Sequence, residues 1–209
     1  MIKKATLWSS AAVLCSTLMA CERDNEQPAQ TAEGTREPVT NSMPSDTVQQ
    51  PQQAGQEQVQ HAKAELKAAE GQDIEGNVEL FSTADGVRIV AEVEDATPGK
   101  HGLHIHERGD CSNIMGESMG GHFAPEKQQH ALPAEGSDRH LGDLGNIEIN
   151  QDGDGRLEIT VKGATLKPDD KMSFLGKAVV VHMGEDMGKE KQPSGSSGTP
   201  IACGSIKAS

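Results

Sequence analysis

The feature that most constrains the fold is a series of short, mostly alternating apolar runs, each ended by glycine or by small polar residues. Alternation at a period of two places the apolar side chains on one face of a β-strand. Eight segments carry this pattern: residues 64–68, 77–81, 87–93, 102–106, 145–149, 157–161, 178–182 and 201–206. Many short strands separated by glycine-rich turns favour an antiparallel sandwich or barrel. We therefore predict an all-β domain of eight antiparallel strands within residues 61–209.

The first 20 residues read as an export signal. Lys3 and Lys4 precede an uncharged, largely apolar stretch at residues 5–20, which is too short for a membrane-spanning helix. Ala20 then precedes Cys21, an arrangement that resembles the bacterial lipobox, in which the peptide is cut before a cysteine that receives lipid. An ordinary signal cut after Ala20 is the alternative. We expect a cell-envelope lipoprotein, anchored in a membrane at Cys21 on the periplasmic or cell-surface side.

Residues 21–60 differ in composition from the segment that follows. They are rich in Gln, Pro, Glu, Thr and Ser and show almost no hydrophobic periodicity. Such a segment cannot bury enough apolar surface to offset the entropy lost on ordering. We predict a disordered tether, and a segment that carries a partner-binding motif is the alternative. The formal net charge of −13 argues against nucleic acids and anionic membrane surfaces as partners.

Four cysteines are present, and two of them are assigned to the export region. Cys15 leaves with the signal and Cys21 is the expected lipid site. Cys111 and Cys203 remain, and an exported protein meets conditions that permit disulfides. The two residues either form a disulfide or stay as two buried thiols, and we expect the disulfide.

Six of the eight histidines lie on predicted strands or beside two long irregular segments, residues 107–139 and 183–200: His104, His106, His122, His130, His140 and His182. The two at 104 and 106 share one face of a strand, since side chains alternate. Asp143 follows His140 by three residues. Imidazole binds copper and zinc well, and a tetrahedral set with a carboxylate favours zinc. Long loops in a compact domain are usually functional. The pattern predicts a metal centre.

At these positions the chain resembles the copper/zinc superoxide dismutase family, over about residues 62–206. The resemblance lies in residues 102–106, 120–125, 138–146, 180–182 and 201–204, and in the eight-residue spacing between His122 and His130. It implies an eight-stranded Greek-key sandwich or barrel with two long functional loops. It also implies dismutation of superoxide anion to oxygen and hydrogen peroxide, which protects the cell envelope from oxidative damage.

The resemblance further implies a role for each candidate residue. Copper would be bound by the four catalytic histidines His104, His106, His122 and His182. Zinc would be bound by His122, His130, His140 and Asp143, with His122 bridging the two ions. Asp186, four residues after His182, would contact ligands of both metals.

One departure from the family concerns the positive charge that attracts superoxide. The family has an arginine three residues before its second disulfide cysteine, and Pro200 occupies that position here. Lys189 and Lys191 lie in the corresponding loop and either replace the arginine or are ordinary exposed lysines. We expect a turnover that is lower than usual but not zero.

Two alternatives to the enzyme follow from the same residues. A copper- and zinc-binding envelope lipoprotein that buffers or delivers metal is favoured by Pro200 and by four methionines near the ligand segments: Met115, Met119, Met183 and Met187. Thioethers favour Cu(I), although methionine more often fills gaps in packing. A purely structural lipoprotein leaves the histidines unexplained. Members of the family occur as monomers and dimers, so a homodimer is a further possibility.

Overall fold

A computed structural model describes residues 59–115 and 118–209. The predicted signal peptide, Cys21 and all but the last two residues of the predicted tether lie outside the described residues. Within the described part of the chain, no helix is both long and apolar enough to cross a membrane.

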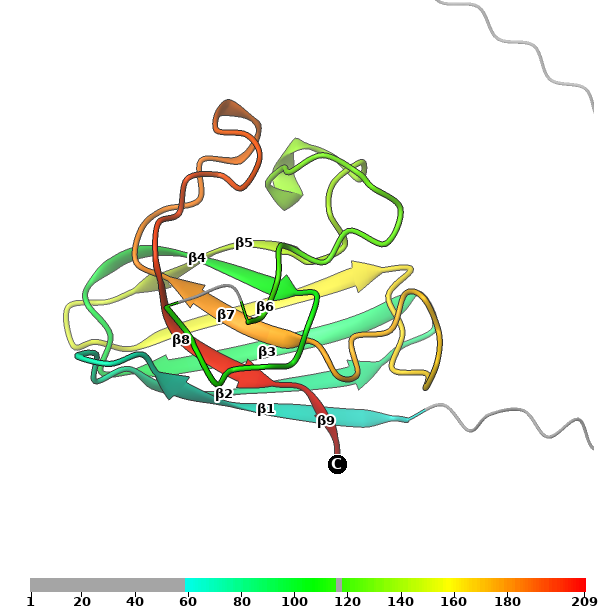
Figure 1. Cartoon of the computed structure of the whole chain (residues 1–209), viewed down its shortest axis with the longest axis horizontal. Helices are drawn as coiled ribbons and strands as arrows, with labels where there is room; N and C mark the ends of the chain where they lie inside the picture. The colour runs from blue at the N-terminus through cyan, green and yellow to red at the C-terminus, as the bar shows by residue number, and fades with distance from the viewer. Residues whose placement is uncertain (1–58, 116–117) are drawn as a thin grey trace, which may run out of the picture. The chain divides into compact units, whose positions relative to one another are not determined.

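The regular secondary structure of the described chain is almost all β-strand (Figure 1). They are β1 (His61–Ala68), β2 (Glu75–Ser82), β3 (Gly86–Glu94), β4 (Gly99–His106), β5 (Asp143–Ile149), β6 (Gly155–Lys162), β7 (Ala178–His182), β8 (Pro200–Ser205) and β9 (Lys207–Ala208). The first eight coincide with the eight predicted strands. The two-residue β9 was not predicted, because a segment that short has no measurable periodicity. Two short 3-10 helices, η1 (Pro133–Glu135) and η2 (Gly188–Glu190), lie in the long loops.

The strands close into an antiparallel barrel, in the order β1-β2-β3-β6-β5-β4-β7-β8 and back to β1. β3 and β4 are consecutive in the chain but are separated in the sheet by β6 and β5. As a result, β6 pairs with β3 and β7 pairs with β4. This strand order confirms the expected all-β class and its Greek-key connection. Closure removes the free strand edges that an open sheet would expose, and β9 adds only a short pairing with β1.

The barrel interior is filled by aliphatic side chains, because the chain has only 2% aromatic residues. Along β1 the burial alternates residue by residue, as the sequence pattern requires. Phe174 is the largest fully buried side chain and packs edge-on against Phe123. Val59 already packs against this core, and its carbonyl accepts a 2.7 Å hydrogen bond from the Ser82 hydroxyl. The chain therefore joins the barrel just before β1.

Two long loops, residues 107–142 and 183–199, stand over the same part of the barrel (Figure 1). They are tied together by Gln192, whose amide donates a 2.7 Å hydrogen bond to the carbonyl of His130. The strand register shifts next to these loops, between Leu103 and His104 in β4 and between Val181 and His182 in β7. Bulges of this kind re-aim side chains, and both lie beside a predicted metal ligand.

Candidate metal centre

Four of the predicted ligands come together on the outside of the barrel, beneath the long loops. His104 and His106 lie on β4, His182 ends β7, and His122 is held beside His106 by an isolated antiparallel bridge. One ring nitrogen from each of the four lies within 4.8 Å of those of the others. We call these residues the four-histidine group.

Backbone carbonyls fix the orientation of two of these rings. The Nδ1 atoms of His106 and His182 donate 2.8 Å hydrogen bonds to the carbonyls of Gly120 and Gly198. Burial lowers the pKa of His106 to about 3 and that of His182 to about 4, so both rings are neutral near pH 7. Each Nε2 therefore carries a lone pair, and the two Nε2 atoms lie only 3.4 Å apart. A cation between them would turn this repulsion into attraction.

His104 supplies a third nitrogen without a partner. Its ring is fully buried, and its Nε2 donates a 2.9 Å hydrogen bond to Oδ2 of Asp186. Its Nδ1 has no hydrogen-bond partner among the described residues. Buried polar atoms without partners are rare in folded proteins. The donor set of this group fits a copper ion, because all of its ligands are imidazole nitrogens.

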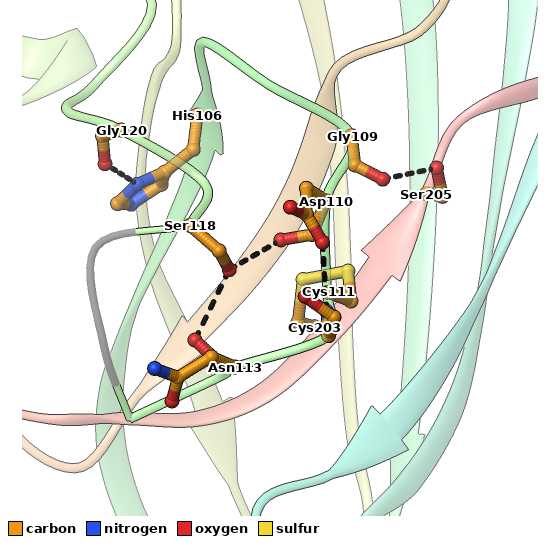
Figure 2. Close-up of a disulfide and its surroundings, with 10 residues drawn as sticks. His106, Gly109, Asp110, Cys111, Asn113, Ser118, Gly120, Cys203 and Ser205 are labelled. Carbon is orange, nitrogen blue, oxygen red and sulfur yellow. Dashed lines mark hydrogen bonds between the residues drawn. A yellow bond between two sulfur atoms is a disulfide. The ribbon is translucent and has the colours of Figure 1, made fainter.

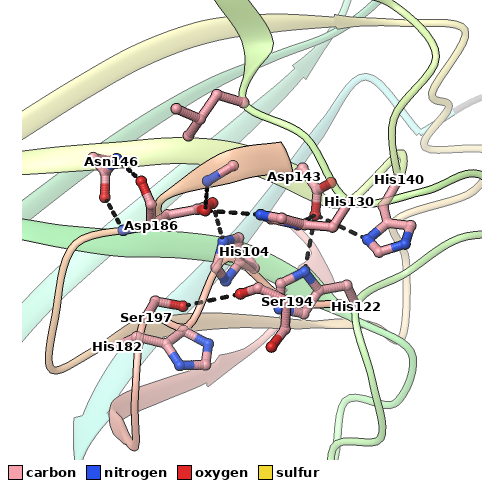
Figure 3. Close-up of polar contacts among 12 residues, drawn as sticks. His104, His122, His130, His140, Asp143, Asn146, His182, Asp186, Ser194 and Ser197 are labelled. Atoms are coloured by element: carbon pink, nitrogen blue, oxygen red, sulfur yellow. Dashed lines mark hydrogen bonds and ion pairs between the residues drawn. The ribbon is translucent and has the colours of Figure 1, made fainter. Parts of the chain in front are cut away.

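The second predicted set surrounds one carboxylate oxygen (Figure 3). The Nδ1 atoms of His122, His130 and His140 lie 2.9, 3.0 and 3.2 Å from Oδ1 of Asp143. The other oxygen of Asp143 accepts a 3.0 Å hydrogen bond from the amide of Ala131. Burial would raise the pKa of Asp143, but the hydrogen bonds from the three histidines hold it well below its usual range. Three imidazoles and one carboxylate are a suitable donor set for zinc.

His122 belongs to both sets. Its Nδ1 faces Asp143, so the opposite ring nitrogen is the one available to the four-histidine group. The centroids of the His122 and His104 rings are 3.9 Å apart. A single imidazole therefore joins the two sets.

Asp186 links the two sets by accepting a hydrogen bond from one histidine of each. Its Oδ2 accepts from His104 and its Oδ1 accepts a 2.7 Å hydrogen bond from Nε2 of His130. Asn146 on β5 holds the backbone of this residue, because its side chain accepts from the Asp186 amide at 2.7 Å and donates to the Asp186 carbonyl at 3.0 Å. Sequence reasoning proposed the link through Asp186 but missed the role of Asn146. A polar residue within the apolar run of β5 is the only signal that the sequence offers for it.

Glu135 joins the two long loops at a second point, which sequence reasoning also missed. Its Oε2 accepts hydrogen bonds from the amide of Leu132 at 2.6 Å and from the amide of Lys189 at 3.1 Å. The Lys189 ammonium donates in return to the Glu135 carbonyl at 3.1 Å. Lys189 is therefore engaged with the neighbouring loop. Lys191 is exposed and makes no ion pair with any described residue.

The expected disulfide between Cys111 and Cys203 is present, with the two Cα atoms 5.7 Å apart. Figure 2 shows that it fastens the first long loop to β8. The same loop is closed by the Ser118 hydroxyl, which donates to the carbonyl of Asp110 at 2.7 Å. Because Gly120 lies in this loop, the disulfide helps to hold the carbonyl that orients His106.

Pro200 lies close to the four-histidine group. It begins β8 directly opposite His182 in the strand register. A proline carries neither charge nor a backbone N–H group. The residue at this position therefore contributes no positive charge beside His182.

The four methionines near the ligand segments differ in their exposure. Met119 is buried and packs against the disulfide. The large hydrophobic side chains exposed in the described part are the other three: Met115, Met183 and Met187.

His101 is buried on β4, and its two ring nitrogens lie 2.8 Å from the carbonyl oxygens of His182 and Thr97. It supports the backbone of a predicted ligand, a role that the sequence did not indicate.

The chain is similar to known proteins both in sequence and in fold. A family model described as copper/zinc superoxide dismutase matches residues 74–206. The extracellular Cu-Zn superoxide dismutase of Caenorhabditis elegans is 35% identical over 136 residues, which span 63% of this chain and 60% of that protein. The extracellular enzyme of Drosophila melanogaster is 36% identical over 140 residues, or 64% of this chain and 75% of that protein. The crystal structure of the clock protein EA4 superposes with a TM-score of 0.66 at 31% identity, covering 74% of this chain and 98% of that one.

Proposed function

The chain belongs to the copper/zinc superoxide dismutase family, and we propose that it dismutates superoxide at a copper ion held by His104, His106, His122 and His182. Copper and zinc are the cofactors of this family. The observation that carries the copper assignment is the pair of neutral Nε2 atoms that face each other 3.4 Å apart in His106 and His182. Their Nδ1 atoms are already bonded to carbonyls, so only Nε2 is free to bind a metal.

Copper bound by these four histidines would supply the one-electron redox chemistry that dismutation requires. Two superoxide anions and two protons thereby become oxygen and hydrogen peroxide. The residues of the chain provide the ligand geometry and one proton position. The nitrogen of His122 that faces the four-histidine group can hold a proton for the peroxide, while its Nδ1 stays with the second set.

We assign zinc to His122, His130, His140 and Asp143. Zinc has no redox chemistry under these conditions. Zinc bound by these residues would keep the His122 ring in place and order the two long loops above it. Asp186, supported by Asn146, holds ligands of both sets in position. Groups that hydrogen-bond to metal ligands set the orientation and basicity of the ligand rings.

Attraction of superoxide to this acidic chain requires a local positive potential. Pro200 supplies none, and the ammonium of Lys189 is bonded to the carbonyl of Glu135. We assign the guiding charge to Lys191, which is exposed and unpaired within the described residues. One exposed lysine focuses the substrate less than an arginine beside the copper would, so the expected turnover is lower than usual for the family.

The chain is an exported protein, in keeping with relatives that are named extracellular. The finer assignment rests on the sequence alone: a signal peptide at residues 1–20, lipid on Cys21, a tether up to residue 60, and action in the cell envelope. Membrane fractionation and mass spectrometry of the wild-type chain and Cys21→Ala test it. Loss of both the lipid mass and membrane retention in the variant is expected, and an unlipidated wild-type chain would contradict the anchor.

The activity is tested by the rate of superoxide decay with the metal-loaded full chain, compared with His106→Ala. Decay that requires copper and is lost in the variant is expected. If the chain bound copper and zinc stoichiometrically without accelerating decay, the second candidate function would replace the first. That candidate is metal buffering or delivery, and Pro200 is the observation that favours it.

A homodimer of the described part would have few large apolar side chains to bury. The large hydrophobic side chains exposed in the described part are three methionines, two of which lie in the second long loop. The interfaces of stable homodimers are usually more apolar than this exposed surface. Sedimentation of the full chain is the direct measurement of its oligomeric state.

A further inference from the structure

A groove of about 590 Å³ lies on the outside of the barrel, away from the metal ligands. Its walls come from β1, β8, β9 and the loop that carries the disulfide, with Cys111 and Cys203 among the lining residues. Three lysines line it: Lys63, Lys67 and Lys207. We call it the lysine groove.

The three lysines are exposed and make no ion pair with any described residue. Some other exposed cations of the barrel have acidic partners. Arg88 pairs with Glu158 at 3.0 Å and Lys100 pairs with Glu185 at 2.9 Å. The groove is distinguished by bringing three unpaired ammonium groups together in a chain with a net charge of −13.

Two of these lysines face each other directly. Lys63 on β1 is the register partner of Lys207 on β9. Like charges placed opposite each other on neighbouring strands destabilise the pair. Such an arrangement becomes favourable when an anion lies between the two ammonium groups.

The groove also supplies neutral hydrogen-bonding groups and one opposing charge. The Asn77 side chain lines it and has no hydrogen-bond partner among the described residues, and Ser112 lies beside the disulfide. Glu65 stands between Lys63 and Lys67 on the exposed face of β1 and reduces the local positive charge. Lys67 also borders a neighbouring groove that contains Asp73, Glu75, Glu92 and Glu94. Lys63 is the register partner of Glu79 on β2 and borders a further groove that contains Glu79 and Glu92. Lys207 is therefore the cation least offset by acidic neighbours.

From these observations we propose that the lysine groove binds phosphate-bearing anions through Lys63 and Lys207, with Lys67 and the Asn77 amide as additional donors. Either a free phosphate or the headgroup of an anionic phospholipid presents this chemistry. The groove runs along β1 from Lys63 to Lys67. This site does not depend on the proposed dismutase function. Net charge disfavours anionic surfaces as a whole, but the local charge of the groove has the opposite sign.

The test uses the full chain loaded with zinc and reduced copper, labelled with ¹⁵N, and follows backbone amide shifts by NMR. Three soluble probes are added at constant ionic strength: inorganic phosphate, short-chain phosphatidylglycerol and short-chain phosphatidylcholine. Saturable shifts at Lys63, Asn77 and Lys207 are expected with the first two. Tighter binding of phosphatidylglycerol than of phosphate would identify a lipid headgroup as the source, and equal binding would identify the phosphate alone.

Variants locate the site. The double variant Lys63→Gln/Lys207→Gln is expected to weaken phosphate binding roughly tenfold, since each exposed charge pair contributes up to about 1 kcal/mol. Glu65→Gln is expected to strengthen it, and Lys162→Gln, an exposed lysine on β6, to leave it unchanged. The proposal is overturned if phosphate produces no saturable shift, or if the double variant binds as tightly as the wild type. It is also overturned if phosphatidylcholine binds as well as phosphatidylglycerol while phosphate does not bind.

Discussion

The Nε2 atoms of His106 and His182 lie 3.4 Å apart, and each ring is held there by a hydrogen bond from Nδ1 to a backbone carbonyl. The protein therefore brings two lone pairs together before any metal binds. That arrangement costs stability unless a cation lies between the rings. The metal centre and the stability of the domain are coupled for this reason.

Removal of both metals is expected to lower the thermal unfolding midpoint of the full chain. A ligand that binds only the folded state stabilises it by about 4 kcal/mol at 1,000 times its dissociation constant. Differential scanning calorimetry of the metal-loaded and metal-free chains measures the shift, with zinc alone as an intermediate sample. Equal midpoints in all three samples would contradict the coupling.

The metal-free chain is expected to lose stability as the pH falls below about 6.5. Burial lowers the folded-state pKa of His106 to about 3 and that of His182 to about 4, whereas unfolded histidines titrate near 6.5. Between these values the unfolded chain binds more protons at these two positions, so their contribution is intact above pH 6.5 and is lost as the pH falls toward 4. His130, whose pKa is raised to about 9, acts in the opposite direction but only above pH 6.5. Thermal unfolding of the metal-free chain between pH 8 and pH 4 measures this decline. In His182→Gln the decline should be shallower, and an identical slope would contradict the assignment.

Asp186→Asn is expected to weaken zinc binding by a factor of about 10 to 100, the usual effect of losing a group that orients metal ligands. The wild-type carboxylate accepts from both His104 and His130, whereas an amide has only one accepting oxygen. Competition with a zinc chelator gives the affinity. Asp73→Asn, an exposed position far along the chain from the ligands, is the matched control and should bind zinc as the wild type does. Equal affinity in the two variants would remove Asp186 from the metal centre.

Glu135→Gln is expected to release zinc faster, by about tenfold if the lost charge-assisted hydrogen bonds contribute about 1.5 kcal/mol. Glu135 connects the loop of His130 to the loop of Asp186 through the amides of Leu132 and Lys189. Zinc release into excess chelator, followed by stopped flow, measures the rate. Glu126→Gln is the control, because Glu126 is in the same loop but contacts only the exposed Lys171 and the neighbouring Gln128. A rate in Glu135→Gln no higher than in this control would show that the contact is dispensable.

Pro200→Arg is expected to raise the superoxide decay rate several-fold at low ionic strength, because a cation beside His182 attracts the anionic substrate. The gain should shrink as salt is added, since the effect acts through a screened field. Pro200→Gln separates the charge from the loss of the proline ring. No gain in the arginine variant, or an equal gain in both variants, would count against missing charge as the cause of a low turnover.

The sequence by itself determined the strands and the types of ligand. Alternation at a period of two is a local property, so all eight strands from β1 to β8 could be predicted, whereas the two-residue β9 could not. The histidines and Asp143 were recognisable because metal chemistry restricts the residue types and their spacing. The pairing of Cys111 with Cys203 followed from the count of cysteines and is present.

Only the tertiary structure decided how these residues act on one another. Asn146 meets Asp186 across 40 positions and Glu135 meets Lys189 across 54, and no local pattern encodes either contact. The register of β1 against β9 likewise places Lys63 opposite Lys207, which are at opposite ends of the domain in sequence. The physical reason is that barrel closure and strand register set these distances through the packing of the whole core, while periodicity and residue type report only on near neighbours.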